Sequence, residues 1–201
     1  MTISLLLASS LPEITLARRP DRLLDGSQRA GTTARRTQVT DPRIRRLQPE
    51  DVDAVVGLVH ELADYEKAPD ECHLTAEQLT EALFCDRPAL YGHVAVVDGV
   101  VVGCALWFLN FSTWRGVHGI YLEDLYVQPK QRGSGLGKAL LTTLAEECAQ
   151  HGYQRLEWWV LNWNTPAIEF YESLGAAAMD EWTVYRLTDK PLTALGAGTA
   201  G

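Results

Sequence analysis

The stretch Tyr121-Leu122-Glu123-Asp124-Leu125-Tyr126-Val127, with Arg132-Gly133-Ser134-Gly135-Leu136-Gly137-Lys138 shortly after it, decides the fold class of this chain. An apolar strand carries two carboxylates in its middle and leads through a glycine-rich loop into an amphipathic helix. Glycines let the backbone approach a ligand closely, and the start of a helix attracts anions. The pattern therefore predicts a phosphate-bearing ligand beside an acidic strand.

The glycine-rich loop does not match two common phosphate-binding patterns. A Walker loop needs glycine at position 132 and serine or threonine at position 139, where the chain has Arg132 and Ala139. A dinucleotide fingerprint that starts at residue 133 needs glycine at position 138, which is Lys138. What remains is Arg-x-x-Gly-x-Gly over residues 132–137. Taken alone, this pattern also fits an ordinary glycine-rich turn that caps a helix.

Composition indicates a globular protein with one folded domain. The chain has 201 residues, 46% of them hydrophobic and 22% charged. No apolar run approaches the ~20 residues that a membrane helix needs, and residues 4–11 are too short and lack the basic lead of a secretory signal. The four cysteines show no paired spacing, and the five histidines show no metal-ligand pair. We therefore expect a cytoplasmic protein with no disulfide and no metal site.

Charge divides the chain into two parts. Residues 1–46 contain nine arginines and four acids, whereas residues 47–201 contain nine basic and twenty-two acidic residues. The basic part is irregular, so residues 1–42 are predicted to form a disordered leader. The acidic part disfavours nucleic acid and favours small cationic substrates. No nucleic-acid or membrane partner is expected, although contact of the leader with either is an alternative.

Periodicity and turn signals predict the order β-α-α-β-β-β-α-β-α-β, an α+β domain around a mixed, largely antiparallel sheet. Thr75-Ala76-Glu77-Gln78 is a capping box, and its helix should bury Leu79, Leu83 and Phe84. Asp98-Gly99 is a hairpin turn, residues 110–119 are a loop, and Thr165-Pro166 starts a helix. The domain should span 43–190, followed by a flexible tail over 191–201. The strands are predicted at 44–47, 91–97, 100–109, 120–127, 155–161 and 181–187.

The acid strand, the glycine loop and a later Asn164 and Tyr171 stand in an order that resembles the GCN5-related N-acetyltransferase (GNAT) superfamily. The chain looks closest to its diamine (spermidine/spermine-type) and thialysine acetyltransferases. Local matches extend this similarity from residue 44 to residue 187. They are Glu61-Leu62-Ala63-Asp64-Tyr65-Glu66-Lys67, Ser112-Thr113-Trp114, Leu161-Asn162-Trp163-Asn164, Phe170-Tyr171 and Leu174-Gly175-Ala176.

The resemblance implies that acetyl-CoA is the acetyl donor and lies in a cleft where two neighbouring strands splay apart. It also implies a homodimer. The backbone of Leu125 would serve both the pantetheine arm and the thioester oxygen, and the loop amides would hold the pyrophosphate. For Asn164, helix capping is an equally good interpretation. The implied donor contacts are Leu125, Tyr126, Val127, Arg132, Gly133, Ser134, Gly135, Leu136, Gly137, Lys138, Asn164, Pro166, Ala167 and Tyr171.

Amide formation needs a neutral amine, and an alkyl amine has a pKa of about 10.4. Deprotonation near pH 7 therefore costs roughly 4 to 5 kcal/mol. Glu123 is the best candidate base, and the resemblance implies that it faces the cleft and that Tyr171 is the general acid. Because adjacent side chains in a strand face opposite sides, Glu123 and Asp124 are not expected to share one task. The alternative is that both acids are ordinary strand carboxylates.

The acceptor should be a small cationic amine held by acids and aromatic rings. The candidate residues are Tyr65, Glu66, Trp114, Glu123 and Asp124, and Lys67 weakens the case for a long polyamine. A polyamine, a diamine, a lysine analogue or an aminoglycoside fits this chemistry. A non-catalytic acyl-CoA-binding regulatory module is the alternative of another class.

Overall fold

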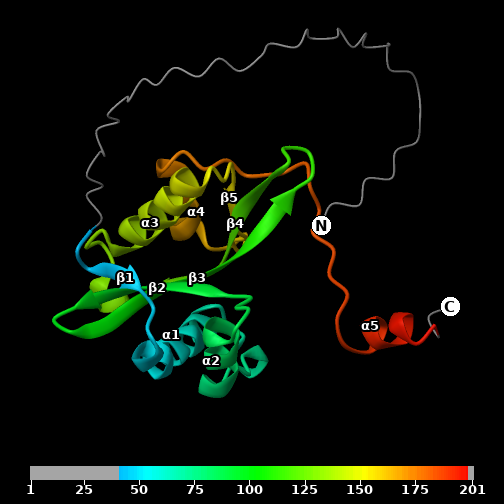
Figure 1. Ribbon diagram of the computed structural model, residues 1–201, viewed down its shortest axis with the longest axis horizontal. Coiled ribbons are helices and arrows are strands. Elements are labelled where there is room, and N and C mark those ends of the chain that lie inside the picture. Colours follow the sequence, from blue (N-terminus) through cyan, green and yellow to red (C-terminus); the bar gives the residue numbers. More distant parts are fainter. Residues whose placement is uncertain (1–40, 199–201) are drawn as a thin grey trace, which may run out of the picture. The chain divides into compact units, whose positions relative to one another are not determined.

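A computed structural model describes residues 41–198, and its central element is a five-stranded sheet in the order β1-β2-β3-β4-β5 (Figure 1). All neighbouring strands are antiparallel except β4 and β5, which are parallel. The predicted α+β class with a largely antiparallel sheet is confirmed. The strands are β1 (Ile44–Arg46), β2 (Tyr91–Val97), β3 (Val100–Ser112), β4 (Val117–Val127) and β5 (Leu156–Glu157).

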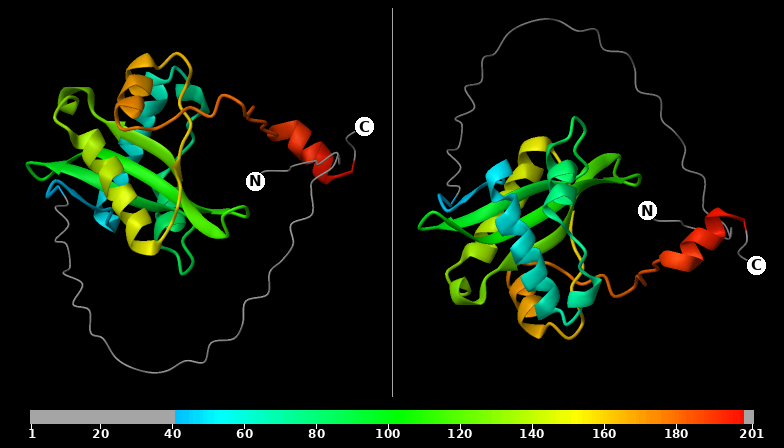
Figure 2. Two further views of the ribbon diagram at one scale, coloured as in Figure 1. Left: turned by 90° about the horizontal axis from the view of Figure 1, so that it is seen from above. Right: turned by 90° about the horizontal axis from the view of Figure 1, so that it is seen from below.

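Helices cover both faces of the sheet (Figures 1 and 2). The α-helices are α1 (Val52–Tyr65), α2 (Ala76–Phe84), α3 (Leu136–His151), α4 (Thr165–Ser173) and α5 (Asp189–Gly196). Three short 3-10 turns, Pro49–Asp51, Pro69–Glu71 and Pro129–Gln131, precede α1, α2 and α3.

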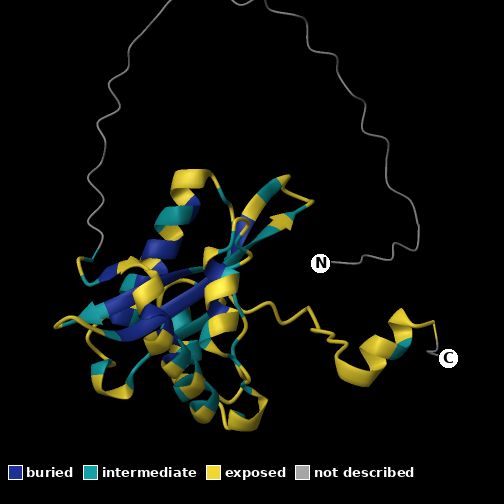
Figure 3. Ribbon diagram, turned by 60° about the horizontal axis from the view of Figure 1, so that its bottom comes forward, coloured by how far each residue is buried: buried dark blue, intermediate teal, exposed yellow. Residues whose placement is uncertain are grey.

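Two buried clusters form the core, one on each face of the sheet (Figure 3). The first joins α1 and α2 to the sheet and includes Val55, Leu58, Leu79 and Tyr126. The second joins α3 to the sheet, and residues of α4 pack against it; it includes Ile120, Leu122, Leu136, Leu140 and Leu144. β4 contributes to both clusters, so its side chains contact both layers of helices.

The local turn and capping signals are confirmed. The Thr75 hydroxyl accepts a hydrogen bond from the Gln78 amide at 3.3 Å, and the Gln78 side chain accepts one from the Thr75 amide at 2.9 Å. Asp98 and Gly99 have φ angles of 50° and 77°, as a tight hairpin turn requires. Phe84 was predicted to face inward but is 40% exposed, because it is the last residue of α2.

The predicted loop over residues 110–119 is largely strand. β3 continues to Ser112, β4 begins at Val117, and the two strands pair from Ser112–Val117 inward. Cross-strand pairing overrides the polar composition of this segment. A bulge interrupts the same pair of strands: Leu106 pairs with Asp124 and Trp107 with Leu122, so Glu123 is the additional residue.

The predicted strand over residues 155–161 is reduced to the two residues of β5. β5 pairs with β4 only at Ile120–Leu156 and Tyr121–Glu157. Beyond Tyr121, β4 continues to Val127 and pairs with β3 alone. Pairing between these two neighbouring strands therefore ends at Tyr121.

The predicted last strand over residues 181–187 is not formed. The segment contains residue types that favour strands, but all of it is exposed and it pairs with no other described strand. A strand requires a hydrogen-bonded neighbour, and residue preference alone does not supply one. Helix α5 follows it, where no helix was predicted, and none of its described residues is buried.

Within residues 41–198, no helix has the length and apolar character needed to cross a membrane. Most of the predicted leader, residues 1–40, lies outside the described residues.

Candidate functional site

The glycine loop leads into α3 with exposed backbone amides. Gly133 and Gly135 have φ angles of 77° and 85°, and Gly135 is the N-cap residue of α3. This left-handed backbone favours glycine over residues with a side chain. Among the described residues, no side chain caps the start of α3. The first amides of the helix are therefore free to donate to an anion.

Arg132 connects this loop to β4 and α1. Its Nε donates a hydrogen bond to the Val127 carbonyl at 3.0 Å. Its guanidinium carbon lies 4.9 Å from the centre of the Tyr65 ring and 5.5 Å from that of Tyr126. The Tyr126 hydroxyl in turn donates to Glu61 of α1 at 3.1 Å. The arginine is thus held in a defined position beside the end of β4.

The edge of β4 beyond Tyr121 is the part of the sheet without a strand partner on the β5 side. It contains Leu125 and Val127, whose backbone the resemblance assigned to the donor, and it leads towards Arg132. The unpaired edge of β4 ends at Val127, and the free amides of α3 follow it after one short loop. Together they form a polar backbone surface that suits an extended ligand with a phosphate group.

Three carboxylates interact near the bulge of β4. The pKa of Asp124 is raised to about 6, mainly by burial and to a smaller extent by the charges of Glu123 and Glu66. Burial also raises the pKa of Glu66, the residue that follows α1. The prediction that Glu123 and Asp124 act separately relied on strict alternation, which a bulge interrupts. The three acids form an electronegative cluster that suits a cation.

Tyr171 lies close to this cluster. Burial raises its pKa to about 12, with the charge of Glu66 as the second cause. Its ring centre is 4.9 Å from that of Trp158 and 5.4 Å from that of Phe170. The phenol is therefore protonated at neutral pH and held by aromatic neighbours, as a proton donor requires.

Asn164 joins α4 to α1. It is 8% exposed and occupies the N-cap position of α4, one residue before the predicted cap Thr165. Its carbonyl accepts hydrogen bonds from the amides of Ala167 and Ile168, at 3.0 and 3.1 Å. Its side chain does not cap the helix but accepts a hydrogen bond from the Tyr65 hydroxyl at 3.0 Å. Pro166 lies in the first turn of α4.

The structure groups most of the predicted residues but leaves Trp114 apart from them. Trp114 lies in the turn between β3 and β4 and is 81% exposed. Two aromatic residues that the sequence prediction did not assign lie nearer the group: Trp158 beside Tyr171, and Trp163 at 5.9 Å from the Tyr65 ring. Trp163 could have been found, since it lies inside the matched segment 161–164.

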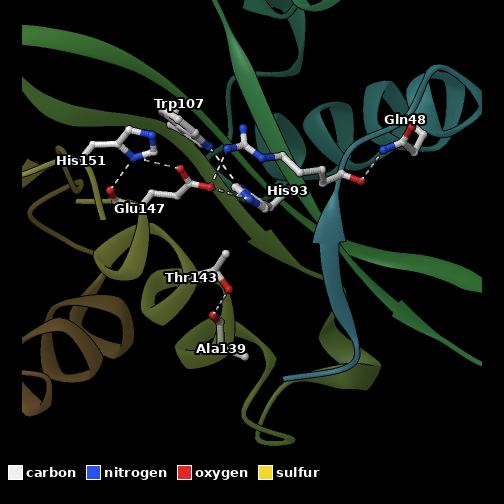
Figure 4. Close-up of polar contacts among 8 residues, drawn as sticks. Gln48, His93, Trp107, Ala139, Thr143, Glu147 and His151 are labelled. Carbon is white, nitrogen blue, oxygen red and sulfur yellow. Dashed lines mark hydrogen bonds and ion pairs between the residues drawn. The ribbon is translucent and has the colours of Figure 1, made fainter. Parts of the chain in front are cut away.

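A second polar cluster lies where β1, β2 and β3 meet α3 (Figure 4). His93 is 2% exposed, and its Nδ1 accepts a hydrogen bond from the Trp107 indole at 3.2 Å. Burial lowers the pKa of His93 to about 4, with the charge of Arg46 as a smaller cause. Glu147 bonds Arg46 and lies 3.9 Å from His93 Nε2.

Two shallow grooves, of ≈ 280 Å³ and ≈ 210 Å³, lie beside β1 and α3. Neither is lined by the three acids or by Tyr171. A neutral buried histidine that accepts an indole hydrogen bond is a packing element, so we place the candidate site at the β4–β5 edge.

Comparison with known proteins identifies the family of this chain. The sequence model of the Acetyltransferase (GNAT) family matches residues 58–176, which include α3, α4 and the acid cluster. A thialysine N-epsilon-acetyltransferase of Bos taurus is 33% identical over 163 residues, which cover 76% of this chain and 95% of the relative. The L-ornithine N5-acetyltransferase NATA1 of Arabidopsis thaliana is 41% identical over 98 residues, 49% of this chain and 43% of the relative.

A solved structure has a similar fold. An integron cassette protein from the mobile metagenome of V. cholerae has a TM-score of 0.65 and 29% identity, and the match covers 76% of this chain and 96% of the other. The chain therefore belongs to the acetyltransferase (GNAT) family and is an acyl-CoA-dependent N-acetyltransferase.

Proposed function

We propose that this chain transfers an acetyl group from acetyl-CoA to the primary amine of a small cationic acceptor, with Glu123 as general base and Tyr171 as general acid. The observation that carries the proposal is the coupling of Glu66, Glu123 and Asp124 beside Tyr171, next to the unpaired edge of β4. A module that only binds acyl-CoA would need neither an acid cluster nor a protonated, half-buried phenol.

The donor site would consist of backbone groups. Acetyl-CoA supplies a thioester, whose acetyl group is already activated. The free amides at the start of α3 would hold its pyrophosphate, and the unpaired edge of β4 at Leu125 and Val127 would hold its arm. The space beside Gly133 and Gly135 is open to a ligand: a methyl group added at either position would meet no protein atom within 4 Å.

The acid cluster would attract the acceptor and take its proton. An ammonium group gains from the charges of Glu66 and Asp124, both of which are costly to ionise without a cation partner. Glu123, at the bulge, would accept the proton directly or through a water molecule, so that the amine can attack. A positioned base of this kind typically contributes ~10²–10⁴ in rate.

Tyr171 would supply a proton to the departing sulfur. Its pKa of about 12 keeps the phenol protonated through the neutral range, so the proton is present when the thiolate leaves. The rings of Trp158 and Phe170 restrict its orientation. The phenol regains its proton from solvent or from the proton accepted by the acid cluster.

Substitution of Glu123 tests the proposal. Glu123→Gln should reduce the turnover of acetyl-CoA and an amine most strongly at neutral pH, measured as release of free thiol. Activity should recover as pH rises, because the neutral fraction of the amine increases about tenfold per pH unit below its pKa. Equal activity loss at every pH would exclude Glu123 as the base. No thiol release by the wild-type protein with polyamines, diamines, lysine analogues and aminoglycosides would refute amine acetylation.

Two further parts of the proposal concern the cellular location and the oligomeric state of the enzyme. We infer a cytoplasmic location from the unpaired cysteines of the sequence, and a homodimer from the resemblance. Fractionation of cells and light scattering of the purified protein test them.

A further inference from the structure

The second residue after the end of α1 has an unusual backbone conformation. Lys67 has a φ angle of 63°, in the left-handed region that favours glycine. Its amide donates to the Asp64 carbonyl at 3.1 Å, and the Ala68 amide donates to the Ala63 carbonyl at 3.0 Å. These two bonds form the helix-ending motif in which glycine is the usual residue at the position of Lys67. Glycine would adopt this backbone conformation with less strain than lysine does. A function of the lysine side chain would explain why lysine stands at this position.

The Lys67 side chain lies over an aromatic ring that neighbours the candidate substrate residue Tyr65. Its Nζ is 5.1 Å from the centre of the Trp163 ring, and Trp163 is 5.9 Å from the Tyr65 ring. Tyr65 bonds Asn164, the residue before α4. Glu66, the direct neighbour of Lys67, acts on the pKa values of Asp124 and Tyr171. The ammonium group therefore lies over an aromatic face, on the residue next to Glu66 in the chain.

This charge argues against an acceptor that carries only positive charge. A free ammonium end of a diamine or polyamine would prefer an aromatic face such as that of Trp163. Lys67 already occupies that face and would repel a second cation. An acceptor with a carboxylate at its far end would instead gain a charge-assisted hydrogen bond from Lys67.

We propose that Lys67 determines acceptor specificity by binding a carboxylate. The acceptor is then an amino acid with an amine on its side chain: the side-chain amine enters the acid cluster, and the α-carboxylate meets Lys67. This inference rests on the proposed function of the site and narrows its substrate class. Lys67 acts here as a specificity residue and takes no part in proton transfer.

The test compares matched acceptors that differ only in the carboxylate. L-ornithine is paired with 1,4-diaminobutane, and L-lysine with 1,5-diaminopentane; thiol release from acetyl-CoA gives kcat/KM for each. The wild-type protein should prefer the amino acid of each pair. Lys67→Gln should lower kcat/KM for the amino acids by about 10-fold to 100-fold, the effect of losing one hydrogen bond between charged groups. It should raise kcat/KM for the diamines, because a repelling charge is removed.

Three further variants separate specificity from charge and stability. Lys67→Arg should retain the preference for the amino acids. Lys67→Gly should lose that preference and yet melt at or above the wild-type temperature, since glycine relieves the backbone at this position. Arg87→Gln, which removes a positive charge from the exposed turn after α2, should leave the preference unchanged.

The results distinguish this inference from the proposed function. If the wild-type protein acetylates amines but Lys67→Gln changes both members of each pair equally, Lys67 does not bind the carboxylate and only this inference fails. If the wild-type protein prefers the diamines, the inference also fails. If it acetylates none of the four acceptors nor any amine of the wider panel, the proposed function fails with it.

Discussion

Replacing Asp124 by asparagine should stabilise the folded protein at neutral pH. In the folded chain the pKa of Asp124 is about 6, against an ordinary value of 3.8, because of burial and the charges of Glu123 and Glu66. At 1.36 kcal/mol per pH unit, this difference corresponds to about 3 kcal/mol of unfolding free energy. The folded state binds more protons than the unfolded state between these two values. Stability from this group is therefore lost as pH rises through about 4 to 6 and is constant above that range.

The wild-type pH profile alone cannot reveal this effect, because His93 acts in the same range with the opposite sign. Burial lowers the pKa of His93 from 6.5 to about 4. The folded state therefore binds fewer protons than the unfolded state there, and stability is lost as pH falls from about 6.5 to 4. The two contributions offset each other in the wild-type protein. A difference between the wild type and Asp124→Asn cancels the contribution of His93.

The measurement is urea unfolding of both proteins at about pH 4 and pH 7.5. Asp124→Asn should be more stable than the wild type at pH 7.5 by up to about 3 kcal/mol, and this gain should nearly vanish at pH 4. Asp86→Asn, in the exposed turn after α2, controls for the removal of one negative charge. The variant should also have a higher KM for the amine. A less stable variant at pH 7.5, or an equal difference at both pH values, would refute the reasoning.

Two further predictions concern the acid and the glycine loop. Tyr171→Phe should slow acetyl transfer while leaving coenzyme A affinity nearly unchanged in calorimetry, because it removes only the buried hydroxyl; undiminished turnover would make Tyr171 a packing residue. Gly135→Ala should destabilise the fold by about 1 kcal/mol in urea unfolding, since alanine is disfavoured at a φ of 85°. It should also weaken coenzyme A binding, and unchanged affinity would separate the loop from the donor site.

Local signals of the sequence predicted the frame of the fold well. The capping box at Thr75 and the turn at Asp98-Gly99 form as predicted, because their hydrogen bonds and backbone angles depend on neighbouring residues alone. The segment over residues 181–187 shows the limit of such reasoning. It contains residue types that favour strands, but strand formation depends on a free sheet edge, and β5 has only two residues.

The candidate site was predictable as a list of residues but not as an arrangement. Glu123, Asp124 and Tyr171 could be named from the sequence, whereas the interaction between the acids could not. Strict alternation assigns the two carboxylates to opposite sides, and the bulge that interrupts this alternation depends on how β3 pairs with β4. The contact of Lys67 with Trp163 depends on the approach of α1 to the segment before α4, two parts of the chain far apart in sequence.

The bulge of β4 lies close to the point where pairing between β4 and β5 ends. Pairing with β5 ends at Tyr121, and the additional residue of the bulge is Glu123, two positions later. A bulge increases the local twist of its strand, and this bulge lies just beyond the last residue of β4 that pairs with β5. The strand that carries the carboxylates is thus also the strand that exposes its backbone edge. An acyl donor bound along that edge would lie beside the acids, because the same part of β4 carries both features.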